Sequence, residues 1–252
     1  MEEYNDIVYL YDGSFSGFLC CVFEAVARRE QPFAVWAEDA SSPTLYPIRL
    51  IQTRSDRAGR VFRSIGPKMG PRAKSLVSRV FLSGDPDKET LLVRFFVLGY
   101  KIGPNVCKML GHPAVAEVFA LERQVLNEAH YYTEFLRFQQ AEDMLISVIE
   151  PKSYVLPLLK IHFCDRFPDE NLLIADRTHG AALLYRDRKA RYLTLTGEAA
   201  LPEPDENEAR YQQMWKAFYR TIAIRARENP ALRRSHCPKR YWHCMTEMKD
   251  LL

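Results

Sequence analysis

The sequence has no long hydrophobic run, and no apolar stretch approaches the ~18–20 residues that a membrane-spanning helix needs. Its first residues, Met1 to Asp6, are acidic and lack the basic stretch that opens a secretory signal peptide. The six cysteines include no CxxC pair, and disulfide frameworks are typical of short secreted chains. We therefore expect a cytoplasmic protein with reduced thiols and no contact with a membrane.

The sequence also lacks recognised catalytic and cofactor motifs, among them GxGxxG, the Walker motif, HExxH, the serine nucleophile elbow, the EF-hand and the kinase set. The segment 236–244 (HCPKRYWHC) brings four possible nitrogen and sulfur ligands together. Adjacent His-Cys couples point apart on a regular backbone, however, so the spacing does not fit a zinc site. We predict no bound metal and no cofactor, and the motifs name no reaction.

The composition is that of a globular protein. The chain has 252 residues, of which 47% are hydrophobic and 27% charged. This length allows one large domain or two small ones, with a core that needs no disulfide or metal to stabilise it. A disordered, collagen-like or coiled-coil protein is excluded.

The formal net charge of +3 hides a strong polarisation along the chain. Residues 49–80 hold nine Arg and Lys against one Asp, which gives +8, and residues 216–240 hold eight against one Glu, which gives +7. The rest of the chain must therefore carry −12. Arg dominates both basic segments, and its planar guanidinium binds phosphate through two hydrogen bonds.

These segments predict contacts with a nucleic-acid backbone, with interleaved aromatic residues stacking on bases. The alternative is that the charges lie on solvated helix faces and the aromatics in the core. The aromatic residues interleaved with the second segment are Trp215, Phe218, Tyr219, Tyr241 and Trp242. The candidate nucleic-acid-binding residues are Arg54, Arg57, Arg60, Lys68, Lys216, Arg240, Tyr241 and Trp242.

The N-terminal half is predicted to be mainly helical. A strand over residues 7–11 ends at Asp12-Gly13, and Ser14 is a suitable N-cap for a helix reaching Val26. This start is typical of a nucleotide-binding crevice, but without a glycine-rich fingerprint an ordinary strand and helix is favoured. Short extended pieces follow, with a strand over 46–53. Apolar residues then repeat at helical spacing from about 55 to 129, interrupted by Gly-Pro turns.

The C-terminal half is predicted to contain a sheet. Residues 133–139 and 144–150 alternate as a β-hairpin does, a helix follows over 154–167, and three extended segments cover 171–176, 181–185 and 191–196. An acidic linker at 198–208 leads to a helix over 207–228 and a short helix from Tyr241. The fold class is α+β: a helical N-terminal half, then an antiparallel sheet (hairpin plus meander) with helices on one face. We expect parts at 1–130 and 131–252, or one integrated domain.

A group of polar residues could carry chemistry. His162 and Arg166 lie one helical turn apart on an apolar stripe, and a buried guanidinium requires a carboxylate or an anionic ligand. The group is either a structural ion-pair network or a phosphate-holding catalytic site. The candidate catalytic residues are His130, Arg137, Glu150, His162, Asp165 and Arg166.

Several sequence words occur together in one order, and they carry a resemblance to a known family. The words are EAH (128–130), FLRF (135–138), IEPK (149–152), VLPLL (155–159) with HF (162–163) and RF (166–167), WK (215–216), and PKRYW (238–242) with Glu247. YLYDGSF (9–15) and residues 53–65 extend the match. Nearly the whole chain thus resembles a bacterial family of DNA metabolism or DNA repair proteins that carry a domain of unknown function.

The resemblance implies a role in DNA repair or modification. In that family the domain also occurs fused to uracil-DNA-glycosylase-like domains, and stand-alone members are encoded beside a radical-SAM protein. DNA and a radical-SAM protein are therefore the implied partners. One departure is Lys152-Ser153, where the family commonly has a His after the Glu-Pro pair, and this weakens any paired-histidine site.

Three functions follow as hypotheses. The first is a DNA-binding protein that assists a radical-SAM or glycosylase partner. The second is an enzyme that acts on a phosphodiester or a base of nucleic acid with the His, Glu and Arg residues above. The third is a protein–protein scaffold, with the acidic N-terminal region as its contact surface.

Overall fold

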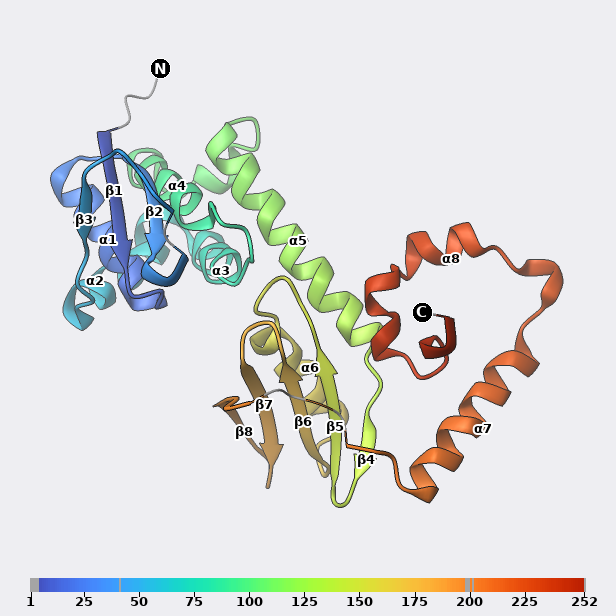
Figure 1. Ribbon diagram of the computed structural model, residues 1–252. Coiled ribbons are helices and arrows are strands. Elements are labelled where there is room, and N and C mark those ends of the chain that lie inside the picture. Colours follow the sequence, from blue (N-terminus) through green and yellow to red (C-terminus); the bar gives the residue numbers. More distant parts are fainter. Residues whose placement is uncertain (1–4, 41, 198–199, 201, 252) are drawn as a thin grey trace. The chain divides into compact units, whose positions relative to one another are not determined.

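The computed structural model describes residues 5–40, 42–197, 200 and 202–251 (Figure 1). The first residues of the acidic N-terminus and part of the predicted linker at 198–208 lie outside these ranges. The chain divides into two compact units, the first ending at Leu126 and the second beginning at Asn127. The long helix α5 (Pro113–Phe135) contributes residues to both.

The sheet of the first unit is entirely parallel. It contains β1 (Asn5–Tyr11), β2 (Pro32–Ala37) and β3 (Ile48–Leu50) in the order β2-β1-β3. β1 ends where expected, because Asp12-Gly13 turns the chain and Gly13 has a φ of +75°. The predicted N-cap is confirmed, since the Ser14 hydroxyl accepts the N–H of Gly17 at 2.9 Å.

Helices account for most of the rest of the first unit. They are α1 (Phe15–Arg28), α2 (Ser55–Met69), α3 (Pro71–Val80), α4 (Lys88–Ile102) and the start of α5, with short 3-10 helices at Glu38–Ala40 and Val106–Lys108. Pro71 starts α3 after Gly70, whose φ is +88°. α1 and α4 pack on the sheet, α2 and α3 pack on these two helices, and the apolar side chains form one core that includes Tyr9, Tyr11 and Val35.

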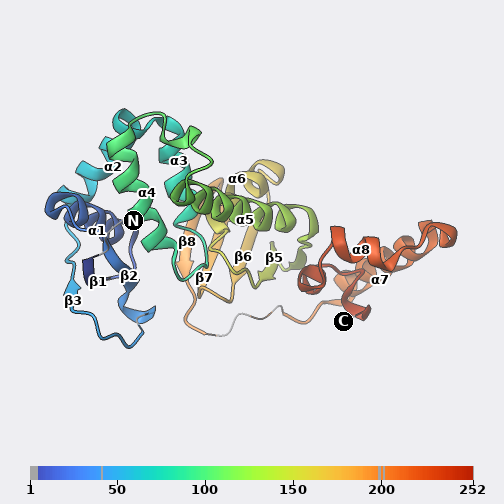
Figure 2. The same cartoon turned by 90° about the horizontal axis from the view of Figure 1, so that it is seen from above.

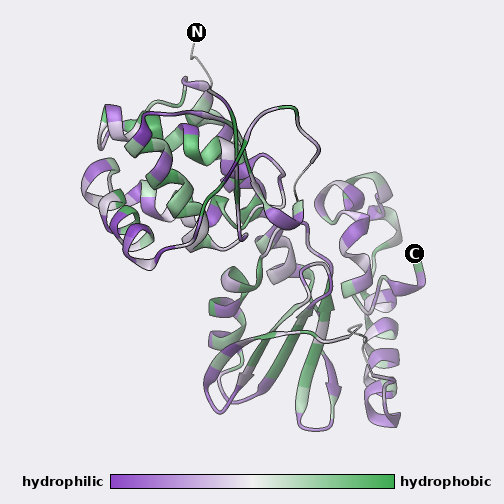
Figure 3. Ribbon diagram, turned by 60° about the vertical axis from the view of Figure 1, so that its left-hand side comes forward, coloured by the Kyte–Doolittle hydropathy of each residue, from purple (hydrophilic) through white to green (hydrophobic). Residues whose placement is uncertain are grey.

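The sheet of the second unit is mixed. It has the order β4-β5-β6-β7-β8, with β4 (Gln139–Ala141), β5 (Met144–Ile149), β6 (Asn171–Asp176), β7 (Ala181–Arg186) and β8 (Lys189–Thr194). The predicted antiparallel sheet is only partly confirmed, because β5 and β6 are parallel. The helix between them, α6 (Leu156–Arg166), makes the crossover that a parallel pair needs. α6 covers one face of this sheet (Figure 2). The strands β5, β6 and β7 are mainly hydrophobic (Figure 3).

The predicted strand at 133–139 is wrong for most of its length. α5 continues to Phe135, and only Gln139 belongs to β4. Ala129, Tyr132 and Leu136 are buried together at helical spacing, and their packing outweighs the local alternation of residues 133–139.

The C-terminal part of the second unit is helical. α7 (Glu206–Ile222) begins at the N-cap Asp205 and ends six residues before the predicted boundary. It is followed by a 3-10 helix at Arg225–Arg227, α8 (Pro230–His236) and 3-10 helices at Lys239–Cys244 and Lys249–Leu251. Among the described residues, no helix combines the length and apolarity required to cross a bilayer.

Candidate functional site

The six predicted catalytic residues do not gather into one site. His130 is exposed and pairs with Glu134 on the next turn of α5, with Nε2 at 3.0 Å from Oε1. Glu150 pairs with Arg177 on the surface at 2.9 Å. Within the described part of the chain, none of the six forms a hydrogen bond or ion pair with another, so they do not form the expected cluster.

α6 turns its predicted polar residues outward. Its buried side chains are Leu156, Leu159 and Phe163, and the His162 ring lies edge-on to Phe163. His162, Asp165 and Arg166 are exposed. The expectation of a buried Arg166 is therefore wrong: its guanidinium lies over the Phe167 ring at 5.5 Å and needs no buried anion.

A buried carboxylate joins three of the family's sequence words. Glu128 on α5 is almost fully buried and accepts the backbone N–H groups of Lys152 and Ser153, each at 2.9 Å. It also accepts a hydrogen bond from the guanidinium of Arg240 at 2.9 Å, and Arg240 in turn donates to the hydroxyl of Tyr241. The backbone of Lys152 makes the contact while its side chain is exposed, so this anchor tolerates the departure from the family pattern.

A second buried carboxylate joins two more of these words, FLRF and WK. Glu247 accepts a hydrogen bond from Arg137 at 3.0 Å and one from the indole N–H of Trp215 at 2.9 Å. It thereby connects the segment after α5 to the middle of α7. Glu128 and Glu247 thus hold together segments of the second unit that are far apart in the sequence.

The predicted base-stacking pair belongs to the core. Tyr241 is fully buried and packs against Tyr131 and Tyr132, with ring centroids 5.1 Å apart in each case. Trp242 is also buried and donates its indole N–H to the carbonyl of Cys237 at 2.9 Å. Neither ring is accessible to a base, which corrects the prediction for both.

Most basic residues of the segment 49–80 have acidic partners. Arg54 pairs with Asp56 at 3.2 Å, whereas the carboxylates that neutralise the others come mainly from α1 and α5. The remaining pairs are Arg49 with Glu30, Arg57 with Glu24, and Arg72 and Arg79 with Glu122. Lys216 and Arg240 of the second segment are likewise paired, with Asp250 and Glu128.

Four cations of α2 and α3 differ from these. Arg60, Arg63, Lys68 and Lys74 are exposed and form no ion pair with any described residue. Three of them lie over aromatic rings in cation–π contacts. The distance from the charged group to the ring centroid is 5.9 Å for Arg60 and Phe23, 4.9 Å for Lys68 and Tyr100, and 4.2 Å for Lys74 and Phe62. We call these four residues the cationic face.

Hydrogen bonds connect the polar side chains at the end of β1. The carboxylate of Asp12 accepts the N–H and hydroxyl of Ser14 at 3.0 and 2.7 Å, and the hydroxyl of Thr53 at 2.7 Å. Burial raises the pKa of Asp12, but these hydrogen bonds outweigh it and the net effect is a lowered pKa. The protein's own carboxylate thus occupies the position in front of α1 where a bound phosphate would lie.

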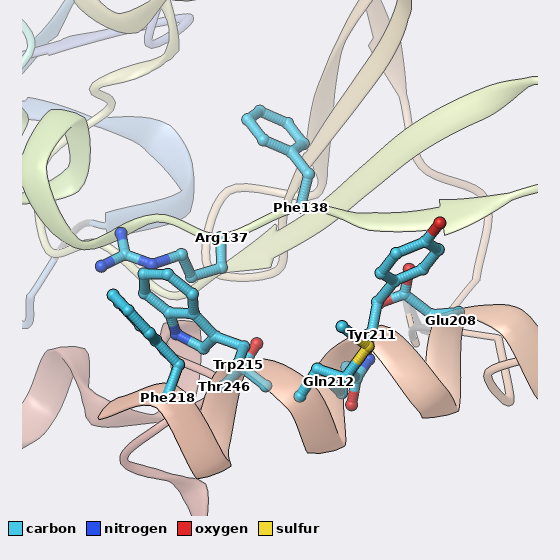
Figure 4. Close-up of a pocket in the computed structure, with 9 residues that line it drawn as sticks. Arg137, Phe138, Glu208, Tyr211, Gln212, Trp215, Phe218 and Thr246 are labelled. Carbon is cyan, nitrogen blue, oxygen red and sulfur yellow. Dashed lines mark hydrogen bonds between the residues drawn. The ribbon is translucent and has the colours of Figure 1, made fainter. Parts of the chain in front are cut away.

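A groove of about 610 Å³ runs along α7 (Figure 4). Tyr211, Trp215 and Phe218 form its α7 side, and the Arg137 side chain lies beside Trp215, from the segment that leads into β4. Phe138 also borders the groove, but its ring points away from α7 and packs against Phe163 and Phe167. The three aromatic residues are 66%, 40% and 53% exposed. Glu208 and Gln212 supply polar groups at one end of the groove.

The sequence pointed to only part of this groove. Trp215 and Phe218 were among the interleaved aromatics, but Tyr219 turns away to pack against the buried cluster of Cys237, Trp242, Met245 and Met248. The spacing of Tyr211, Trp215 and Phe218 on one side of a helix was a signal that could have identified the groove.

Comparison with known proteins supports a family assignment. The family model described as "Domain of unknown function (DUF4130)" matches residues 86–247, well over half of the chain. Both buried carboxylates and the α7 groove lie in the matched region, whereas the cationic face lies before it. No match to the chain is found among curated proteins. The chain therefore belongs to the family of proteins that contain the domain of unknown function DUF4130.

Proposed function

We propose that this protein binds DNA through its cationic face and assists in DNA repair or modification. The observation that carries the proposal is the contrast between the four cations of this face and their paired neighbours. An arginine already bonded to a carboxylate gains little from a phosphate, whereas an unpaired cation releases the counterions of DNA when it binds. The resemblance supports the DNA context, with a radical-SAM or glycosylase partner supplying the chemistry.

Binding of labelled DNA tests this proposal. Fluorescence anisotropy would be recorded with a 20-base-pair duplex and a 20-nucleotide single strand at about 50–200 mM salt. We expect the variant Arg60→Gln, Arg63→Gln, Lys68→Gln, Lys74→Gln to lose at least tenfold in affinity at the low-salt end, because its phosphate contacts are gone.

A matched variant controls for net charge. It replaces four exposed cations elsewhere, namely Lys101→Gln, Arg123→Gln, Arg210→Gln and Arg234→Gln. We expect it to bind like the native protein. Equal losses in the two variants, or no DNA binding by the native protein at 50 mM salt, would refute the cationic face as a DNA-binding surface.

A further inference from the structure

We infer that the groove along α7 is a docking site for an acidic amphipathic helix of a partner protein. This surface differs from the cationic face, and the inference does not depend on DNA binding. Four large residues of α7 form the apolar side of the groove, and Ile222 continues the same side of the helix beyond it. All five are at least 40% exposed: Tyr211, Met214, Trp215, Phe218 and Ile222.

These residues form one stripe. Their spacing of three or four residues places them on one side of α7, over a length of about 17 Å at 1.5 Å per residue. That length matches about three turns of a bound helix. Exposed apolar patches of this kind mark interaction sites, and tryptophan, tyrosine, phenylalanine and methionine are enriched in protein interfaces.

Contacts on the opposite side of α7 fix the position of this helix beside the groove. Tyr219 packs against the buried cluster of Cys237, Trp242, Met245 and Met248, and Glu247 holds both Trp215 and Arg137 by hydrogen bonds. These contacts fix the rotation of α7 and hold the Trp215 ring in place, so that the stripe stays on the exposed side of the helix. A surface fixed in this way loses little conformational entropy when a partner binds.

A helix fits the groove better than an added strand. The facing strand β4 is short, and the N–H of Gln140 on it is already bonded to the carboxylate of Glu208 at 3.2 Å. Strand addition needs such N–H groups to be free. Helix docking needs only the exposed side chains of α7.

The charge next to the stripe favours an acidic partner. Beyond Phe218, the end of α7 borders a second hollow of about 910 Å³ that extends to α8. Three arginines line it, Arg220, Arg227 and Arg233, with Glu228 as the one carboxylate side chain among its lining residues. Arg220 pairs with Asp250 at 3.3 Å, whereas Arg227 is exposed and forms no ion pair with any described residue. A carboxylate of a docked helix would pair with Arg227.

A nucleic acid fits the groove less well. The cation within the groove, Arg137, is already bonded to Glu247, and the carboxylate of Glu208 would repel a phosphate there. Bases stacked on Trp215 and Phe218 would have no phosphate anchor beside them. For this reason we assign the groove to a protein helix.

Two synthetic peptides test the inference with the full-length protein. Both are 14-residue helices with leucines at positions i, i+3, i+4 and i+7, one carrying glutamates at the remaining positions and the other lysines. We expect fluorescein-labelled acidic peptide to bind at least tenfold more tightly than basic peptide. The variant Met214→Ser, Phe218→Ser should lose at least tenfold in affinity, and Arg227→Glu should reduce the preference for the acidic peptide.

The control variant is Ile161→Ser, which removes an exposed apolar residue of α6 in the same unit and should bind like the native protein. Equal binding of the two peptides, or no binding of either, would overturn the inference. So would an oligothymidylate of 20 nucleotides that displaces the acidic peptide, since the groove would then take a nucleic acid. Sedimentation that shows a dimer converted to monomer by Met214→Ser, Phe218→Ser would instead assign the groove to a second copy.

Discussion

At the scale of single residues, Gly17 shows how closely the chain packs at the end of β1. A Cβ at this position would lie 2.2 Å from the Asp12 carboxylate and 2.7 Å from the Thr53 hydroxyl. The hydrogen bond between Asp12 and Thr53 therefore requires a glycine at position 17. The sequence indicated that Asp12 belongs to a turn and that Ser14 is an N-cap, but it did not indicate the contact of Asp12 with Thr53, 41 residues away.

The variant Gly17→Ala should destabilise the protein by about 1–3 kcal/mol, because the added methyl group displaces Asp12 or Thr53. Urea unfolding followed by circular dichroism measures the change. Gly59→Ala in α2 is the control, since its new Cβ meets only the flexible Arg63 side chain at 3.4 Å. It should be neutral or stabilising by up to about 1 kcal/mol. A loss of stability in Gly59→Ala equal to that in Gly17→Ala would contradict this account.

Glu89 is the residue whose ionisation should be most visible in the stability of the first unit. Its side chain is buried, and burial raises its pKa despite Lys88 nearby and a hydrogen bond from Tyr11 at 2.9 Å. A carboxyl with a folded pKa above its unfolded pKa stabilises the protein at low pH. That contribution is lost as pH rises through the folded pKa.

The variant Glu89→Gln keeps an acceptor for Tyr11 but cannot ionise. Its free energy of unfolding, relative to the native protein, should therefore increase as pH rises from about 4.5 and then level off. Urea unfolding between pH 4 and pH 8 gives this difference. A difference that stays constant over the whole range would show that Glu89 has no raised pKa.

At the scale of elements, the carboxylate of Glu128 connects three segments: α5, the turn after β5 and the 3-10 helix Lys239–Cys244. The sequence predicted the helix that carries Glu128. It did not predict that Glu128 and Arg240 are in contact, because these residues are 112 positions apart in the chain. Local patterns contain no information on such a pairing.

Replacing Glu128 with Ala should cost about 1–3 kcal/mol, because it leaves the buried N–H of Ser153 and the half-buried N–H of Lys152 without their acceptor and breaks the pair with the partly exposed Arg240. Limited proteolysis should then cut within residues 236–245 faster than in the native protein. The surface variant Glu150→Gln, which breaks only an exposed pair, should change stability by less than about 1 kcal/mol. If the two variants were equally stable, Glu128 would not be an anchor.

At the scale of the whole molecule, the net charge of +3 is too small to attract DNA by itself. Binding must come from the local arrangement of charges. Four phosphate contacts by the cationic face would give a slope of log affinity against log salt of about −3.6. The variant of the face and its matched control remove the same total charge, so only the former should flatten this slope. An equal flattening of the slope in both variants would assign the binding to net charge, and no flattening in the variant of the face would show that the face does not contact phosphate.

The sequence by itself determined what depends on neighbouring residues. Apolar spacing, caps and turns predicted most helices and strands, including β6 at its observed boundaries and the N-cap Ser14, since hydrogen bonds and side-chain faces within one element follow local periodicity. The alternation at 133–139 gave a wrong prediction because it depends only on neighbouring residues. It shows that one side of the segment is apolar, but it does not show which part of the fold packs against that side. The α+β class followed from the order of these elements.

Only the tertiary structure decided which charges are available and which aromatic residues are buried. Carboxylates that lie mainly on α1 and α5 pair with five arginines of residues 49–80, which leaves four cations without a pair among the described residues. The fold buries Tyr241 and Trp242 and exposes Tyr211, Trp215 and Phe218. Pairing and burial depend on distances across the fold between residues far apart in the chain, and no sum or spacing along the sequence contains those distances.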